Sequence, residues 1–367
     1  MKTVLTIIRW VVGLLFIFSG LIKSNDPLGL SYKMLEFFEA WGFHFLDNYT
    51  LSFSVVMNIC EVLAGVAIII GWRIKFFSWF LLSLILFFTF LTAYVLFSGQ
   101  IKECGCFGDC IPLTGSSTFI KDIALLLLIL IIFFNTQKIK QALSSGISIS
   151  VLIVTIIAAI AVQFYVLKHL PFFDCLPYKK GNNILNEMKA PAGSVPDSFA
   201  IRFRYKKNNR VVEFDQAHFP NDFDSSYEYV DRFDQLIRKG NATPAIPDFS
   251  LRTIDGVDST SFILQQNRKY ILLFAKDFSN VQDWKNDFKE LLVVATSKKI
   301  AVYVITADAD NGIQLFKNVP VFKCDATVIK TAARVNPTYF LMQEAAVLNK
   351  FSYADSRLLL QEIANAK

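Results

Sequence analysis

Three of the six cysteines lie within seven residues, in the segment Cys104-Gly-Cys-Phe-Gly-Asp-Cys110. This cysteine loop (residues 104–110) is a short polar gap between two long apolar runs. A thiolate in such a place attacks a disulfide, and a neighbouring thiol then resolves the mixed disulfide. Cys104, Cys106 and Cys110 are therefore the candidate catalytic residues of a thiol–disulfide exchange site.

Two other interpretations of the cysteine loop stay open. A structural disulfide would only pin the loop and leave one idle thiol; the spacing allows a strained Cys104–Cys106 bridge or a less strained Cys106–Cys110 bridge. A metal site is disfavoured, because no histidine or second cysteine pair lies nearby at zinc spacing. Cys175 either exchanges with the loop or is a free or structural thiol.

Cys60 and Glu61 lie near the middle of an apolar run at residues 51–72. A carboxyl group at that depth in a membrane is costly, so an intramembrane acid is by default a hypothesis for a functional site. Glu61 could bond to a quinone oxygen or carry a proton, with Cys60 beside it. It could equally pair with Arg9 or Lys23 as a structural lock, and Cys60 could be a small apolar residue with no further role.

The rest of the composition predicts how these residues are positioned. The 367 residues are 53% hydrophobic, the mean hydropathy is +0.42, and the long apolar runs fall within the first 170 residues. These features predict a membrane α-helical bundle followed by a water-facing part. An interfacial helix is expected within residues 23–48. The predicted spans are residues 4–22, 51–72, 76–97, 119–134 and 147–167.

The basic residues predict the orientation of the bundle. Lys and Arg cluster near the N-terminus, at 73–75 and at 138–140, which should all lie on the cytoplasmic side. The cysteine loop and everything after residue 167 are then periplasmic, where disulfides persist. We expect an inner-membrane protein that contacts the lipid bilayer. The net charge of +6 does not indicate nucleic-acid binding, since many basic residues flank apolar runs.

The water-facing part has the pattern of an α/β domain. Residues 198–214 predict a hairpin, 241–247 a linker, and the segment from 248 a further β-hairpin. Buried strands alternate with a helix after that, and an antiparallel pair and a last helix close the chain. The expected strands are 269–275, 300–306, 319–325, 337–342 and 346–351, and the expected helices are 281–298, 326–335 and one from 355.

Residues 245–367 resemble a thioredoxin-fold domain of the kind carried by membrane-tethered periplasmic thioredoxins. The segment Asn336-Pro337-Thr338 stands where that fold keeps a cis-proline. The active-site C-x-x-C of the fold is missing: residues 276–281 read Lys-Asp-Phe-Ser-Asn-Val. The remaining thiol, Cys324, is expected to be a buried strand residue. Dithiol exchange within this domain is therefore excluded, and the missing cysteines favour a binding or docking role for the domain.

Residues 1–140 resemble the DoxX/MauE group of small membrane proteins. The residues that carry the resemblance are Phe18-Ser19-Gly20, Lys23, Asp26-Pro27, Glu61 and the CGCFG run at 104–108. Members are associated with disulfide formation in periplasmic partners or with quinone-linked sulfur metabolism. Their four-helix arrangement is also similar to that of quinone-coupled thiol oxidoreductases.

Four units and two functions follow as predictions. The units are a bundle at 1–140, a fifth helix with an exit segment at 141–183, a hairpin-containing connector at 184–244 and the thioredoxin-like domain at 245–367. The first function is a thiol–disulfide, quinone-linked redox protein that acts on a separate envelope redox protein through the cysteine loop. The second is a non-enzymatic, membrane-anchored subunit or scaffold of a larger envelope complex.

Overall fold

The computed structural model describes residues 2–99, 101, 105, 108–111, 113–215, 218–238 and 240–365 of the chain. Cys104 and Cys106, two of the three predicted catalytic residues, lie outside the described residues.

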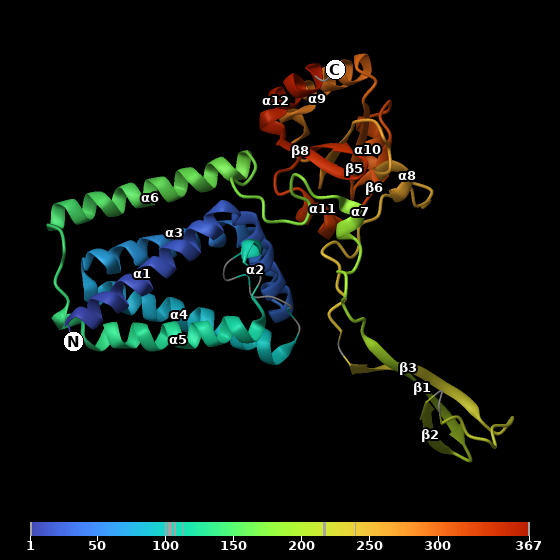
Figure 1. Cartoon of the computed structure of the whole chain (residues 1–367), viewed down its shortest axis with the longest axis horizontal. Helices are drawn as coiled ribbons and strands as arrows, with labels where there is room; N and C mark the ends of the chain where they lie inside the picture. Colours follow the sequence, from blue (N-terminus) through green and yellow to red (C-terminus); the bar gives the residue numbers. More distant parts are fainter. Residues whose placement is uncertain are drawn as a thin grey trace.

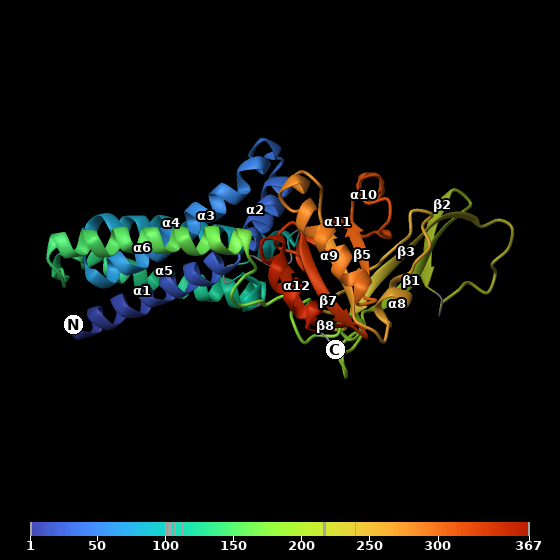
Figure 2. The same ribbon diagram turned by 90° about the horizontal axis from the view of Figure 1, so that it is seen from above.

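Five helices are long and apolar enough to cross a membrane, and they confirm the predicted helical membrane region. Four of them extend one to four residues beyond the predicted run at one or both ends, whereas α3 begins one residue earlier than predicted and ends two residues earlier. They run alongside one another in Figures 1 and 2. The helices are α1 (Lys2–Asn25), α3 (Thr50–Ile70), α4 (Ile74–Ser98), α5 (Gly115–Phe134) and α6 (Ser145–Lys168).

Helices α1 and α3 approach closely through two glycines. A Cβ atom added to Gly13 would lie 2.9 Å from the carbonyl oxygen of Gly65, and one added to Gly65 would lie 2.6 Å from that of Gly13. Small residues let helix backbones approach in this way in membranes, where the hydrophobic effect gives no force between helices. The close packing fixes the depth of Glu61 on α3 against α1.

A short helix lies across the end of the bundle at which α1 ends (Figure 1). This helix, α2 (Pro27–Trp41), starts at its N-cap Asp26, whose side chain accepts a hydrogen bond from the backbone N–H of Gly29. It stops at Gly42, whose φ of +73° favours glycine. The 3-10 turn η1 (His44–Tyr49) then leads into α3. The predicted short helix within residues 23–48 is confirmed.

The C-terminal domain is built on a five-stranded sheet in the order β6-β5-β4-β7-β8. Strands β4, β5 and β6 are parallel, and β7 and β8 run antiparallel to their neighbours. A cis bond joins Asn336 to Pro337 before β7, as the thioredoxin resemblance predicts. The strands are β4 (Tyr270–Ala275), β5 (Ala301–Thr306), β6 (Val321–Lys323), β7 (Thr338–Gln343) and β8 (Ala346–Ser352).

Both faces of this sheet are buried. Ile271 and Leu273 pack against α9 (Lys285–Ser297) and α12 (Ser356–Ala364), whereas Leu272 and Phe274 pack against the opposite core, which includes α11 (Ala326–Ala332). Alternate residues of a strand point to opposite faces, so a fully apolar strand is required at the centre of a covered sheet. Figure 1 shows α11 on the side of the domain that meets the bundle.

One prediction for this domain is wrong, and one of its helices was missed. The β-hairpin expected from residue 248 is reduced to an isolated bridge between Arg252 and Asp258, followed by α8 (Thr260–Leu264). Arg252 also bridges Lys323 at the end of β6, and this contact takes up the backbone groups that a hairpin would use. The short helix α10 (Ala309–Leu315) was not predicted, because its polar sequence has no apolar period.

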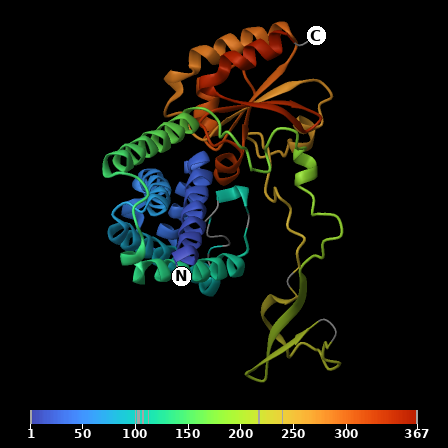
Figure 3. The ribbon, with the colours of Figure 1, turned by 60° about the vertical axis from the view of Figure 1, so that its left-hand side comes forward.

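A three-stranded sheet projects away from the rest of the molecule (Figures 2 and 3). It has the order β2-β1-β3, and the predicted hairpin forms its first two strands, β1 (Ser198–Lys207) and β2 (Arg210–Asp215). The third strand, β3 (Glu228–Arg238), was missed. This strand is mostly exposed and is held by backbone pairing with β1. Charged residues therefore interrupt the alternation of apolar and polar residues that would predict a strand.

Candidate functional site

The cysteine loop is joined covalently to the segment that leaves the membrane. Cys110, in the 3-10 turn η2 (Gly108–Cys110), forms a disulfide with Cys175, with a Cα–Cα distance of 4.8 Å. The two cysteines are 65 residues apart in sequence. The Cys106–Cys110 bridge that the spacing allowed is therefore not formed. Cys110 pairs with Cys175 because the chain returns from α6 to the end of the bundle at which η2 lies.

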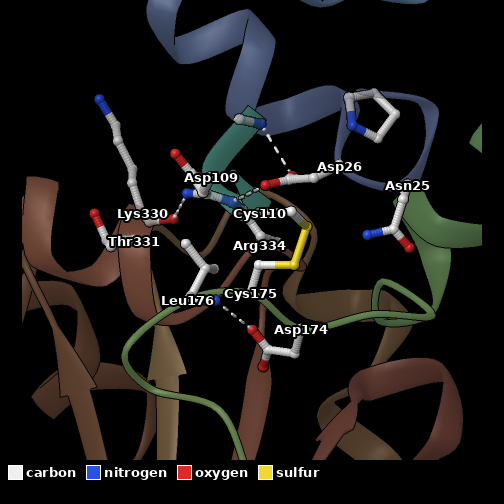
Figure 4. A network of polar contacts seen from close by, with 12 residues as sticks. Asn25, Asp26, Asp109, Cys110, Asp174, Cys175, Leu176, Lys330, Thr331 and Arg334 are labelled. Atoms are coloured by element: carbon white, nitrogen blue, oxygen red, sulfur yellow. Dashed lines mark hydrogen bonds and ion pairs between the residues drawn. A yellow bond between two sulfur atoms is a disulfide. The ribbon is translucent and has the colours of Figure 1, made fainter. Parts of the chain in front are cut away.

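Arg334 lies beside this disulfide and joins the C-terminal domain to the bundle (Figure 4). Its guanidinium donates to Asp26 at 2.7 Å and to Asp109 at 2.5 Å, and the side chain is only 7% exposed. Burial alone would lower the pKa of Arg334, but the carboxylates of Asp26 and Asp109 offset this effect and raise it above its usual range. One cation, two residues after the end of α11, therefore connects the C-terminal domain to the start of α2 and to η2, next to Cys110.

The exit segment on either side of Cys175 is held by further polar contacts. Asp174 forms an ion pair with the buried Lys350 of β8 at 2.6 Å. Asn25, at the end of α1, exchanges two hydrogen bonds with the backbone of Phe173, at 2.8 and 3.1 Å. These contacts hold the disulfide between α1 and the sheet of the C-terminal domain.

An apolar cavity of about 420 Å³ lies between α2, α3 and α4 and reaches the cysteine loop. Gly105, which stands between Cys104 and Cys106 in the sequence, lines this cavity together with Cys60. A Cβ atom added to Gly105, whose φ is +72°, would lie 3.1 Å from Cγ of Lys33. The other lining side chains are mostly aromatic or aliphatic, among them Phe37, Phe38, Trp41, Phe53, Met57, Phe80 and Phe88.

Glu61 faces away from this cavity and forms an ion pair with Lys23 at 2.5 Å. Both side chains are 1% exposed, and Ser19 donates a second hydrogen bond to Glu61 at 2.9 Å. The amino group of Lys23 also lies 4.6 Å from the centre of the Phe88 ring. Of the two partners considered for Glu61, the structure selects Lys23, while Arg9 bonds to the carbonyl oxygen of Lys140 instead.

Sequence reasoning missed a second buried carboxylate near this pair. Asp122 on α5 is 1% exposed, pairs with Lys121 at 2.9 Å and accepts a hydrogen bond from Thr92 at 3.1 Å. A hollow of about 20 Å³ separates it from Glu61, which is enough for roughly one water molecule. The signal was an acid inside the predicted fourth span. Its adjacent lysine made the segment look like an ordinary polar helix end.

Cys324 lies at the end of β6 and is buried, as predicted. Burial raises the pKa of its thiol to about 12, far above that of an ordinary cysteine. Among the residues that the structure describes, no group of three or more histidine, cysteine or acidic side chains is placed to hold a metal ion.

The raised pKa of Cys324 gives a direct test by thiol labelling. At pH 9 only about one in a thousand Cys324 thiols should be ionised, so the folded domain should label with iodoacetamide only very slowly. Labelling should become fast in denaturant, because the pKa then returns to its ordinary value. Mass spectrometry of the Cys324 peptide checks this, and fast labelling in the folded protein at pH 9 would contradict the burial described here.

Comparisons with known proteins support the assignment of the N-terminal residues as a membrane region. A family model described as methylamine utilisation protein MauE matches residues 1–135, and a model of a domain of unknown function (DUF8463) matches residues 199–239. Protein TlpB of Flavobacterium psychrophilum is 28% identical over 163 residues, which is 41% of this chain and 42% of that relative. The aligned part is thus less than half of the relative's length. No solved structure matched the chain. Residues 1–135 therefore form a MauE-type membrane region, and the chain is a membrane protein with a C-terminal α/β domain.

Proposed function

We propose that this protein transfers electrons from the thiols of an envelope protein to a membrane quinone through Cys104, Cys106 and Cys110. One observation carries the proposal: the residue between Cys104 and Cys106 lines an apolar cavity within the helical bundle. Thiols at the edge of an apolar cavity can react with a lipid-soluble oxidant on one side and a water-soluble protein on the other. The likeness of residues 1–135 to MauE is consistent with such a membrane role.

The cavity fits a quinone ring by size and chemistry. Its volume of about 420 Å³ lies within the range of roughly 300–1,000 Å³ for small-molecule sites. Aromatic side chains of α2 and α4 would hold the ring, and the side chains of Lys23 and Lys33 line the same space while their amino groups bond to Glu61 and Glu36. Cys60 would contact the ring from α3. A quinone bound there would supply an acceptor for two electrons and two protons.

The thiol chemistry balances within this scheme. A dithiol in the partner loses two electrons and two protons and becomes a disulfide, and a disulfide of this chain becomes a dithiol. Cys104 and Cys106 would then return to the disulfide by giving two electrons and two protons to a quinone in the cavity, which would become a quinol. Glu61 acts in this scheme as the fixed counter-ion of Lys23, because its two oxygens are already engaged by Lys23 and Ser19.

The C-terminal domain acts in this proposal as a docking module. It has no cysteine pair, and its single thiol, Cys324, is buried and has a raised pKa. The electron donor must therefore be a separate redox protein of the envelope. We place the loop and this domain on the periplasmic side of the inner membrane, since Arg73, Lys138 and Lys140 lie in the turns at the opposite end of the spans.

The second candidate is a non-enzymatic membrane scaffold, in which the C-terminal domain binds a subunit of an envelope complex. The observation that favours it is the Cys110–Cys175 disulfide together with the Arg334 ion pairs, which would fasten a binding domain in a fixed pose. The two candidates differ in whether the loop thiols change their redox state during function.

Replacing Cys104, Cys106 and Cys110 together with serine should abolish quinone reduction. The assay uses the full-length protein in liposomes with a membrane quinone, and it follows quinol formation after addition of a reduced Cys-x-x-Cys peptide. The variant Cys324→Ala changes a buried thiol of the C-terminal domain, away from the cavity and the loop, and as the control it should retain most of the rate. Full activity of the triple serine variant would reject the redox proposal and leave the scaffold.

A further inference from the structure

A second and larger hollow lies between the membrane bundle and the C-terminal domain. It measures about 680 Å³ and is walled by α2 on one side and α11 on the other. Cys175 and the two residues after it form its floor, so this interdomain cleft reaches the disulfide from the water-facing side. Cys110 does not contribute to its lining.

The walls of the interdomain cleft carry both signs of charge. Lys330 stands on α11, with its amino group 5.6 Å from the centre of the Tyr32 ring of α2. Glu36 and Glu39 stand on the α2 wall. Mixed charges beside apolar side chains suit a polypeptide segment better than a single small anion or cation. Arg334, the cation beside the disulfide, also lines the cleft and is paired with Asp26 and Asp109.

We infer that this cleft binds an extended, dithiol-bearing segment of the partner protein and directs its first thiolate to Sγ of Cys175. The inference rests on the proposed function, because it identifies where electrons enter the chain. Cys175 lines the cleft, whereas Cys110 does not, although its neighbour Asp109 does. The sulfur that a thiolate attacks is set by access as well as by leaving-group pKa.

The exchange conserves atoms and electrons. The partner's first thiolate forms a bond to Sγ of Cys175, and the Cys110–Cys175 bond breaks, with Cys110 leaving as a thiolate. The partner's second thiolate then attacks the first partner sulfur and releases Cys175 as a thiolate. The partner is oxidised to a disulfide, the Cys110–Cys175 pair is reduced to two thiols, and the two protons of the partner pass to these thiols or to water.

The attacked sulfur can be identified directly with a single-thiol probe. The full-length protein carrying Cys104→Ser and Cys106→Ser, which keeps the Cys110–Cys175 disulfide, is mixed with a short Cys-x-x-Ser peptide. The reaction is quenched with acid, the free thiols are alkylated, and the linked cysteine is mapped by mass spectrometry. We expect the peptide on Cys175 and the alkyl group on Cys110. A peptide on Cys110, or no adduct at all, would overturn the inference.

A bulky substitution tests whether the cleft itself admits the peptide. Thr331→Trp fills the α11 wall, and Thr296→Trp on α9 is the matched control, since each threonine hydroxyl donates to the carbonyl four residues earlier. Thr331→Trp should slow the reaction of the peptide with the disulfide about tenfold, which corresponds to about 1.4 kcal/mol of activation free energy. The rate of reduction by dithiothreitol should stay unchanged. Two results would contradict a peptide site. One is an equal peptide rate in Thr331→Trp and Thr296→Trp. The other is that Thr331→Trp slows reduction by dithiothreitol as much as it slows the peptide.

The two proposals fail in different ways in these experiments. Both assays run without Cys104 and Cys106, so a failure of quinone coupling leaves their expected results unchanged. If the peptide attaches to Cys175 but quinol never forms in liposomes, the entry site stands and the quinone proposal falls. If quinol forms but the peptide attaches to Cys110, the quinone proposal stands and the entry site falls.

Discussion

Replacing Lys23 with methionine should lower the free energy of unfolding of the helical bundle by about 3–5 kcal/mol. The substitution leaves Glu61, which is 1% exposed, as a buried carboxylate whose cation has gone. Ser19 alone cannot offset the loss of hydration of that charge.

The double variant Lys23→Met/Glu61→Gln separates the effect of the unpaired Glu61 charge from the effect of changing the packing of the Lys23 side chain. It removes both charges, so most of the stability should return. Lys140→Met is the matched control, because this exposed lysine lies at the other end of the bundle and only its backbone accepts a bond from Arg9. Unfolding of the detergent-solubilised protein measures the change. If Lys23→Met is as stable as Lys140→Met, the ion pair does not stabilise the bundle.

The Lys23–Glu61 pair also shows what the sequence could reveal about the site. A carboxyl group in the middle of a span needs a partner, and only a few basic residues lie near the predicted spans. The choice between Arg9 and Lys23 was open, because periodicity does not fix the depth at which two helices pack. The glycine contact between α1 and α3 fixes that depth and brings Lys23 level with Glu61.

The disulfide of the site could not be predicted in the same way. Local spacing suggested partners for Cys110 inside the loop, whereas two membrane helices, α5 and α6, separate it from its partner Cys175. The apolar cavity was also hidden, since aromatic residues of α2 have the same sequence pattern whether they face lipid or line a pocket. The five spans and the buried central strands were predictable because their signals are long and local.

Replacing Arg334 with methionine should weaken the docking of the C-terminal domain by about 2–4 kcal/mol. The expected value lies below that for a fully buried pair, because Asp26 and Asp109 are 17% and 32% exposed and water screens part of their charge. Two carboxylates would then face each other beside the disulfide without a cation. Among the ion pairs of the described residues, those of Arg334 join this domain to α2 and η2.

The redox state of Cys110 and Cys175 should decide how visible this loss becomes. While the disulfide is intact, it keeps the local concentration of the two surfaces high, and the domain stays close to α2 in spite of the substitution. After reduction, the Lys350–Asp174 and His169–Asp355 pairs still hold the exit segment on the domain, but they do not reach α2. Reduced Arg334→Met should therefore show fast amide exchange at the start of α2 and in α11.

Three variants make this test specific. Arg357→Met, on the exposed face of α12, should behave as the wild type in both redox states. Arg334→Lys should fall between the two, because one ammonium group cannot match the planar fork that bonds both carboxylates. Asp26→Asn with Asp109→Asn should partly rescue Arg334→Met by removing the repulsion. Slow amide exchange in reduced Arg334→Met would contradict this prediction. It would mean that apolar contacts, and not the Arg334 ion pairs, hold the C-terminal domain on α2.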